Sequence, residues 1–170
     1  MRKWLRLLLV IVLVLAADQI SKRAVVGQVT LGASIQTVFS PFFQITRSQN
    51  TGASFGFLPQ AGDLFLVIAI VVVLAMVCFY PRIPQNAWLM QVATGLVCGG
   101  ALGNALDRLE YGHVVDFIHY QIPGLISNVS NLADHAIVLG VILLFVDSWR
   151  TERAEKRRQA AAPEDAAPPV

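Results

Sequence analysis

The chain has 170 residues, of which 55% are apolar and only 14% are charged. Its mean hydropathy of +0.60 exceeds that of a typical soluble domain, so the composition indicates an integral membrane protein. The net charge of +2 hides a concentration of Lys and Arg near the two termini, which argues against a nucleic-acid-binding surface.

The first apolar segment lies close to the N-terminus. Its eleven uncharged residues, 7–17, also fit the hydrophobic region of a signal peptide. Asp18 and Lys22 stand one helical turn apart in the order that favours an ion pair, which carries the helical pattern further. We therefore predict a retained membrane span over about 4–25, with Arg6 and Lys22 reaching outward at its two ends.

The region 27–62 has a different character. Polar residues, Gly and Pro return, and the alternation in Phe43-Gln-Ile-Thr-Arg47 predicts short strands. Asn50-Thr-Gly52 is a turn signal, and turn formation alone could account for Asn50. We expect this region to form a small β-rich subdomain outside the membrane.

Two further spans are predicted at 64–80 and 87–106, because each is an uncharged apolar run of membrane length. The connection 81–86 begins with a helix-stopping proline and is too short to fold alone, so the two spans must run antiparallel. The third span contains three glycines at the four-residue spacing that lets helices approach closely in lipid: Gly95, Gly99 and Gly103.

The segment 107–132 reads as irregular, with glycines and a Pro-Gly turn. Asn131 is placed to cap a fourth helix, and Asp134 follows three residues later as in a capping box. We predict a fourth span over 133–149 and a disordered tail over 150–170. The expected fold is an all-α membrane protein of four transmembrane helices, in one domain over 1–149, with a small β-rich subdomain outside the membrane.

The distribution of charge predicts the orientation. With four spans, nine basic residues share one side and four share the other, which places both termini in the cytoplasm. The nine are Arg2, Lys3, Arg6, Arg82, Arg150, Arg153, Lys156, Arg157 and Arg158, and the four are Lys22, Arg23, Arg47 and Arg108. The acids of the 107–134 segment then lie at the outer leaflet.

Asp116 and Asp134 are candidates for an acid–base pair. The Pro-Gly turn between them can return the first acid to the start of the fourth helix, and two close carboxyl groups share one proton. Such a pair can catalyse amide hydrolysis. The helix start favours the charged form of Asp134, whereas the apolar neighbours of Asp116 favour its protonated form. Taken alone, two aspartates are weak support, because helix caps and surface pairs are commoner.

Six sequence blocks in order resemble the signature blocks of lipoprotein signal peptidase, the type II signal peptidase of bacteria. The resemblance covers about residues 10–149 and matches the four-span plan. The blocks are Asp18-Gln-Ile-Ser-Lys22, Asn50-Thr-Gly-Ala-Ser-Phe55, Gly99-Gly-Ala-Leu-Gly-Asn104, Asp107-Arg108, Gly112-His-Val-Val-Asp116-Phe117 and Asn131-Leu-Ala-Asp134.

The resemblance implies that Asp116 and Asp134 form the catalytic dyad of an aspartic endopeptidase. In that family the substrate is a diacylglyceryl-modified prolipoprotein, cut before its lipidated cysteine at the outer face of the bacterial cytoplasmic membrane. It implies a multi-pass protein with no cofactor and no metal, whose partners are prolipoproteins and membrane lipid, and we expect a monomer.

The resemblance also assigns supporting roles. It implies that four polar residues bind substrate or orient the dyad: Asn50, Asn104, Arg108 and Asn131. Asp18 and Lys22 match a structural block. For Asp107 we expect an ion pair with Arg108 that fixes the end of the third helix.

Three other interpretations compete with the peptidase. A metal-dependent protease could use His113, His119 and His135 with the two acids, but no HExxH helix is present. An ion- or proton-coupled carrier could use the acids as a relay, although relays lie nearer the midplane of the membrane. A structural membrane subunit would need no chemistry at all.

Overall fold

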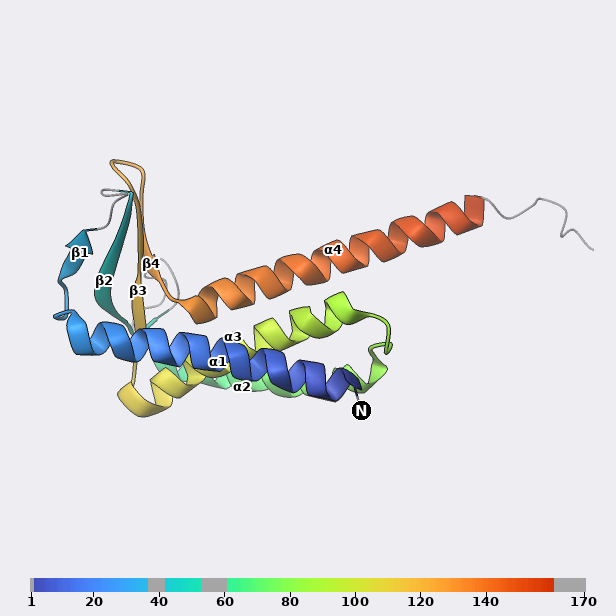
Figure 1. The fold of residues 1–170 in the computed structure, drawn as a ribbon, viewed down its shortest axis with the longest axis horizontal. Coiled ribbons are helices and arrows are strands. Elements are labelled where there is room, and N and C mark those ends of the chain that lie inside the picture. Colours follow the sequence, from blue (N-terminus) through green and yellow to red (C-terminus); the bar gives the residue numbers. More distant parts are fainter. Residues whose placement is uncertain (1, 37–41, 53–60, 161–170) are drawn as a thin grey trace, which may run out of the picture.

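The computed structural model of the protein describes residues 2–36, 42–52 and 61–160. Within them, four helices are long and apolar enough to cross a membrane. They are α1 (Arg2–Gln28), α2 (Gly62–Phe79), α3 (Trp88–Tyr111) and α4 (Leu132–Ala160). Figure 1 shows a sheet at one end of the helices, here called the sheet end. The N-terminus and the end of α4 lie at the opposite, terminal end, as the four-span plan requires.

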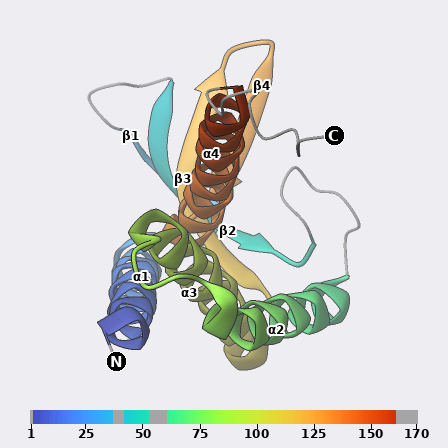
Figure 2. The same cartoon turned by 90° about the vertical axis from the view of Figure 1, so that its right-hand side faces the viewer.

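α3 is the central helix of the bundle. Figure 2 shows α1 and α2 on either side of it and α4 above it, and α3 contacts all three. In its most apolar stretch 67% of the residues are buried, whereas the corresponding value is 6% for α2 and 11% for α1 and α4. The outer helices therefore expose Leu, Val and Ile side chains on their outer faces, as expected of helices that face lipid.

Glycines set the close approach of α3 to its neighbours. A Cβ on Gly95 or Gly99 would lie 2.7–2.8 Å from the side chains of Val10 and Val14 on α1. These glycines thus confirm the predicted small-residue contact, and its partner is α1. On the other side, a Cβ on Gly100 would overlap the carbonyl oxygen of Ala133 on α4.

The sheet has four antiparallel strands in the order β1-β2-β3-β4. β1 (Ser34–Gln36) and β2 (Phe43–Asn50) come from the region predicted to form strands. β3 (Val114–Ile122) and β4 (Ile126–Ser130) come from the segment predicted to be irregular, so that prediction was wrong. The start of β3 is buried without alternation, which removes the period-two pattern by which strands are found in a sequence.

The helices extend beyond the predicted spans. α4 continues to Ala160, so residues 150–160 are helical rather than disordered. This stretch is rich in strong helix formers, and Lys156 pairs with Glu152 one turn earlier. The predicted disorder of 161–170, and the parts of the 27–62 region at 37–41 and 53–60, lie outside the described residues.

The start of α1 is fastened to the connection between α2 and α3. Lys3 Nζ donates to the carbonyl oxygens of Pro81 (2.8 Å) and Ile83 (2.9 Å), and the buried Tyr80 hydroxyl donates to the Lys3 carbonyl (2.6 Å). Arg6 donates to the buried Gln91 side chain rather than reaching outward as predicted. These contacts supply hydrogen-bond partners to polar groups for which lipid offers none.

The contact between α3 and α4 predicts the effect of one methyl group. We expect Gly100→Ala to lower the free energy of unfolding by about 1–3 kcal/mol, because backbone must move to admit the Cβ. Thermal unfolding in detergent measures this. The control is Gly27→Ala, since a Cβ on Gly27 meets no atom within 4 Å; equal unfolding temperatures for the two variants would contradict the packing argument.

Candidate functional site

A buried ion cluster lies near the sheet end of the bundle. Lys22 Nζ is 2.8 Å from Asp18 Oδ2 and 2.8 Å from Asp107 Oδ2, and all three side chains are at most 3% exposed. The predicted pairing of Asp18 with Lys22 is confirmed. Two other predictions were wrong: Lys22 points inward, not outward, and Asp107 pairs with Lys22 rather than with Arg108. Inside the bundle the ammonium is held by one carboxylate of its own helix and one of α3, which offset the free-energy cost of taking it out of water.

The two acids of this cluster also hold backbone. Asp18 Oδ1 accepts the N–H of Ala133 at 3.0 Å, and Asp107 Oδ2 accepts the N–H of Val115 at 3.0 Å. Ala133 directly precedes Asp134, and Val115 directly precedes Asp116. The cluster therefore anchors the chain at the residue before each candidate catalytic acid.

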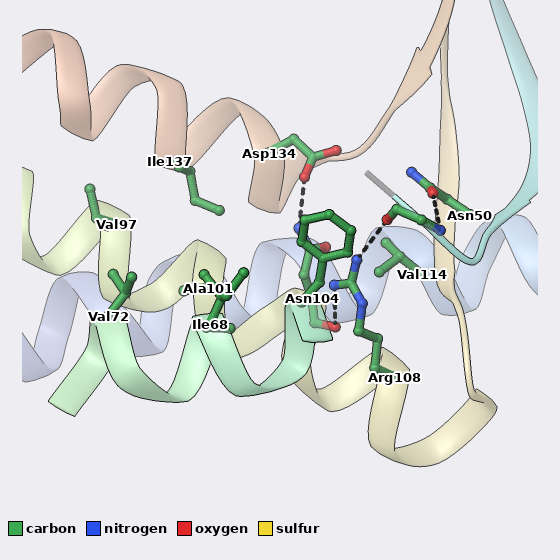
Figure 3. A pocket seen from close by; sticks show the side chains of 13 residues that line it. Asn50, Ile68, Val72, Val97, Ala101, Asn104, Arg108, Val114, Asp134 and Ile137 are labelled. Atoms are coloured by element: carbon green, nitrogen blue, oxygen red, sulfur yellow. Dashed lines mark hydrogen bonds between the residues drawn. The ribbon is translucent and has the colours of Figure 1, made fainter. Parts of the chain in front are cut away.

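The cluster also orients Asn104. Lys22 donates to Asn104 Oδ1 (3.1 Å), so the amide nitrogen of Asn104 points the other way and donates to Asp134 Oδ1 at 2.7 Å. Figure 3 shows Asn104 and Asp134 facing each other across α3 and α4. The three N–H donors of Lys22 are thereby used by Asp18, Asp107 and Asn104.

Asn131 joins the two candidate acids. Its Nδ2 donates to Asp116 Oδ1 at 2.6 Å, and its Oδ1 accepts the backbone N–H of Asp134 at 3.0 Å. Asn131 is therefore the helix cap that the sequence predicted. The capping box is incomplete, because the Asp134 carboxylate accepts from Asn104 instead of turning back to Asn131.

Asp116 receives a second amide from the turn after β2. Asn50 Nδ2 donates to Asp116 Oδ2 at 2.9 Å, while Asn50 Oδ1 accepts the N–H of Gly52 at 3.0 Å. The predicted turn is present, and the same side chain also contacts the acid.

Burial, together with the nearby charge of Asp134, raises the pKa of the Asp116 carboxyl to about 7. The hydrogen bonds from Asn50 and Asn131 and the charge of Lys22 lower this pKa, but they do not offset burial. Asp116 is thus able to hold a proton near neutral pH, as its apolar sequence neighbours predicted.

A largely apolar cavity of about 310 Å³ opens beside these groups. Figure 3 shows it between α2, α3 and α4, with polar groups gathered at the sheet end. Asp116 and Asn131 are nearly inaccessible to solvent, and neither lines the cavity. Its polar lining is Asn50, Asn104, Arg108 and Asp134, and its apolar lining includes Phe65, Ile68, Val72, Val97, Ala101 and Ile137.

Arg108 closes the polar end of the cavity. Its guanidinium donates to the carbonyl oxygens of Asn104 (3.3 Å) and Gly52 (3.1 Å) and lies 5.6 Å from the ring centroid of Phe65. Its Nε is buried and has no hydrogen-bond partner among the residues that the structure describes. A donor of this kind at a cavity wall is suited to a polar ligand.

The three histidines considered for a metal site are dispersed. His119 contacts Ser127 (2.9 Å) and His135 contacts Tyr120 (2.8 Å), while the ring of His113 lies against Tyr111. Within residues 2–36, 42–52 and 61–160, no group of three or more His, Cys, Asp or Glu side chains could hold a metal ion.

Two residues contribute to the ion cluster without having been predicted to do so. Gln19 donates to Asp107 Oδ1 at 2.8 Å, and its polar side chain within an apolar helix was the available signal. Gly103 was read as a packing residue only, although a Cβ there would lie 2.7 Å from Asp18 Oδ2. Gly103 therefore leaves the space that the ion cluster occupies.

Comparison with known proteins gives concordant matches. A family model for signal peptidase (SPase) II matches residues 10–150. Lipoprotein signal peptidases of Desulfitobacterium hafniense and Bacillus subtilis are 39% and 36% identical to the chain. These alignments cover 86% and 89% of this chain and 95% and 97% of the relatives. A bacterial membrane enzyme solved by the in meso method at 2.3 Å resolution matches with a TM-score of 0.76 and 32% identity, over 95% of this chain and 94% of its own.

The ion cluster predicts a large effect of one substitution on stability. Lys22→Met leaves two buried carboxylates without their cation, so we expect the free energy of unfolding to fall by about 3–5 kcal/mol. Thermal unfolding in detergent measures it. The control is Lys156→Met, which removes an exposed pair with Glu152 and should leave the unfolding temperature unchanged. A Lys22→Met protein as stable as wild type would refute the cluster's role.

Proposed function

The chain belongs to the signal peptidase II family, and from this premise we propose that it is an aspartic endopeptidase of diacylglyceryl-modified prolipoproteins. It removes the signal peptide by cutting the peptide bond before the lipidated cysteine. One observation carries the proposal. Asp116 and Asp134 are joined through the single amide of Asn131, and Asp134 lies at the polar end of an apolar cavity between helices that can cross a membrane.

The two acids divide the chemistry. Asp134 accepts the amide of Asn104 and lies in the first turn of α4, where the helix dipole favours a carboxylate. It takes a proton from the water that attacks the scissile carbonyl carbon, while Asp116 gives its proton to the carbonyl oxygen. As the C–N bond breaks, Asp134 protonates the leaving amine, and the new carboxyl group returns a proton to Asp116.

The cavity suits a substrate that arrives from the membrane. It is apolar along its length, and it is bordered on one side by α2, none of whose residues is buried. A diacylglyceryl chain or a signal helix can therefore reach it laterally, between α2 and α4, without crossing water. Phe65, Ile68 and Val72 of α2 then contact the apolar part of the substrate.

Asn50 and Arg108 guide the polar part of the substrate. Asn50 lines the cavity and holds Asp116 Oδ2, so we infer that the substrate carbonyl displaces this amide when it reaches Asp116. The Nε of Arg108, which has no partner among the described residues, then donates a hydrogen bond to a backbone carbonyl of the substrate near the cut site. Both roles agree with those implied by the family resemblance.

The charges support an orientation with both termini in the cytoplasm and the acids at the outer leaflet of the bacterial cytoplasmic membrane. At the sheet end, Lys22 is neutralised inside the bundle, and Arg108 lies at the cavity. Only Arg23 and Arg47 of the four basic residues then remain to oppose the cluster of basic residues at the terminal end. The sequence count of nine basic residues against four therefore supports this orientation.

Cleavage of a diacylglyceryl-modified prolipoprotein in detergent tests the function. We expect wild type to release the signal peptide, and Asp116→Asn and Asp134→Asn each to lower the rate by at least about 10³-fold, because each removes one half of the acid–base pair. Asp63→Asn, which changes an exposed acid in the first turn of α2, should keep the wild-type rate. A carrier or a structural subunit would give no cleavage with any of these proteins.

The raised pKa of Asp116 predicts a pH dependence. Asp116 acts in its protonated form, so its active fraction falls as pH rises through about 7. The single-turnover rate should then fall about tenfold per pH unit at higher pH. Unfolding temperatures over the same pH range show whether the enzyme stays folded. A rate that is constant or rises between about pH 6 and pH 9 would contradict this assignment.

A further inference from the structure

The imidazole of His135 is held at the start of α4, next to Asp134. Its Nδ1 lies 2.6 Å from the carbonyl oxygen of Asn131. A carbonyl only accepts, so Nδ1 carries the hydrogen and donates it. The backbone N–H of His135 reaches the same carbonyl at 3.3 Å. Ring and backbone thus both fix the residue that joins the two acids.

The other nitrogen of the ring faces β3. His135 Nε2 lies 2.8 Å from the Tyr120 hydroxyl, which donates to it when the ring is neutral. Tyr120 also contacts the ring of Phe43 on β2, with centroids 5.9 Å apart. In a strand every second side chain shares a face, so Tyr120 projects to the same side of β3 as Asp116.

We propose that Tyr120 and His135 are positioning residues that brace β3 against the first turn of α4 and so hold Asn131 in its contacts with both acids. Each acid then lies between two anchors. The ion cluster fixes the backbone immediately before Asp116 and Asp134. The Tyr120–His135 brace fixes the same strand and the same helix on the other side of the acids.

The contacts of His135 argue for positioning rather than direct chemistry. Both ring nitrogens are occupied, by a carbonyl and by a phenol, so neither is free to take a proton from water. His135 does not line the cavity that contains Asp134. Its hydrogen bonds instead reach Asn131, whose amide donates to Asp116.

The inference rests on the proposed function, since its main readout is cleavage. The test variant is Tyr120→Phe, which removes the hydroxyl and keeps the ring against Phe43 and His135. A matched control exists in the same hairpin. Ser127→Ala removes a hydroxyl that lies 2.9 Å from His119 Nε2, so it also breaks an imidazole–hydroxyl contact, but one that does not reach Asn131.

We expect Tyr120→Phe to lower kcat by about three- to tenfold with little change in KM, because the acids are misplaced while the cavity is intact. The alkaline limb of its pH–rate profile should move to higher pH, since the hydrogen bond from Asn131 lowers the pKa of Asp116. Ser127→Ala should match wild type in both respects. His135→Ala should lower kcat similarly, and the double variant Tyr120→Phe/His135→Ala should be no worse than His135→Ala alone.

A second readout does not depend on cleavage. Amide hydrogen exchange over residues 131–135 should be at least about threefold faster in Tyr120→Phe than in wild type or Ser127→Ala, because the cap at Asn131 is loosened. The brace would be overturned if Tyr120→Phe and Ser127→Ala had the same kcat, the same pH–rate profile and the same exchange rates. That result would leave the peptidase proposal standing. If wild type does not cleave, the proposed function fails, and the exchange measurement still decides whether the brace exists.

Discussion

The structure depends on the way one buried ammonium group uses its three donors. Lys22 holds Asp18 from its own helix, Asp107 from α3 and the amide oxygen of Asn104. Removing charges from water costs several kcal/mol per ion, so such a cluster is retained where it fixes a geometry rather than for stability alone. Asp107 Oδ2, which also pairs with Lys22, holds the backbone before Asp116, and Asp18 Oδ1 holds the backbone before Asp134. Asn104 is turned toward Asp134. α1, which carries neither candidate catalytic acid, thus holds the backbone before Asp134 directly and contacts Asp107, which holds the backbone before Asp116.

The bundle separates a tightly packed side from an open side. Glycines bring side chains of α1 and the backbone of α4 close to α3, and Gly103 leaves room for Asp18. On the other side α2 buries none of its residues, and the cavity lies there. Small residues on α3 therefore give a rigid frame for the polar groups, while the loosely packed helix leaves an apolar route from lipid. The proposed reaction, which aligns two carboxyl groups and admits a lipid-modified chain, needs both properties.

The sequence was informative where one physical rule dominates. Long apolar runs predicted the four spans, and the small-residue spacing predicted the close helix contact. The spacing of Asp18 and Lys22 predicted their ion pair, and Asn131 was correctly read as a cap. It failed where partners come from distant segments: nothing near Lys22 indicates that it turns inward to Asp107, and the buried start of β3 lacks alternation. The roles of Asp116 and Asp134 came from family resemblance, because the residue pattern alone also fits caps and surface pairs.

The central claim is that the buried cluster positions the two acids, and single-turnover cleavage by Asp107→Asn tests it most directly. The substitution keeps Asp116, Asp134 and the Asp18–Lys22 pair, but replaces one carboxylate oxygen by an NH2 group. Either Val115 and Lys22 or Gln19 then loses its acceptor, and Lys22 loses one of its two counter-charges. With the protein folded, as its unfolding temperature would show, the account predicts at least about a tenfold lower rate with substrate affinity preserved. A folded Asp107→Asn enzyme that cleaves at the wild-type rate would contradict it.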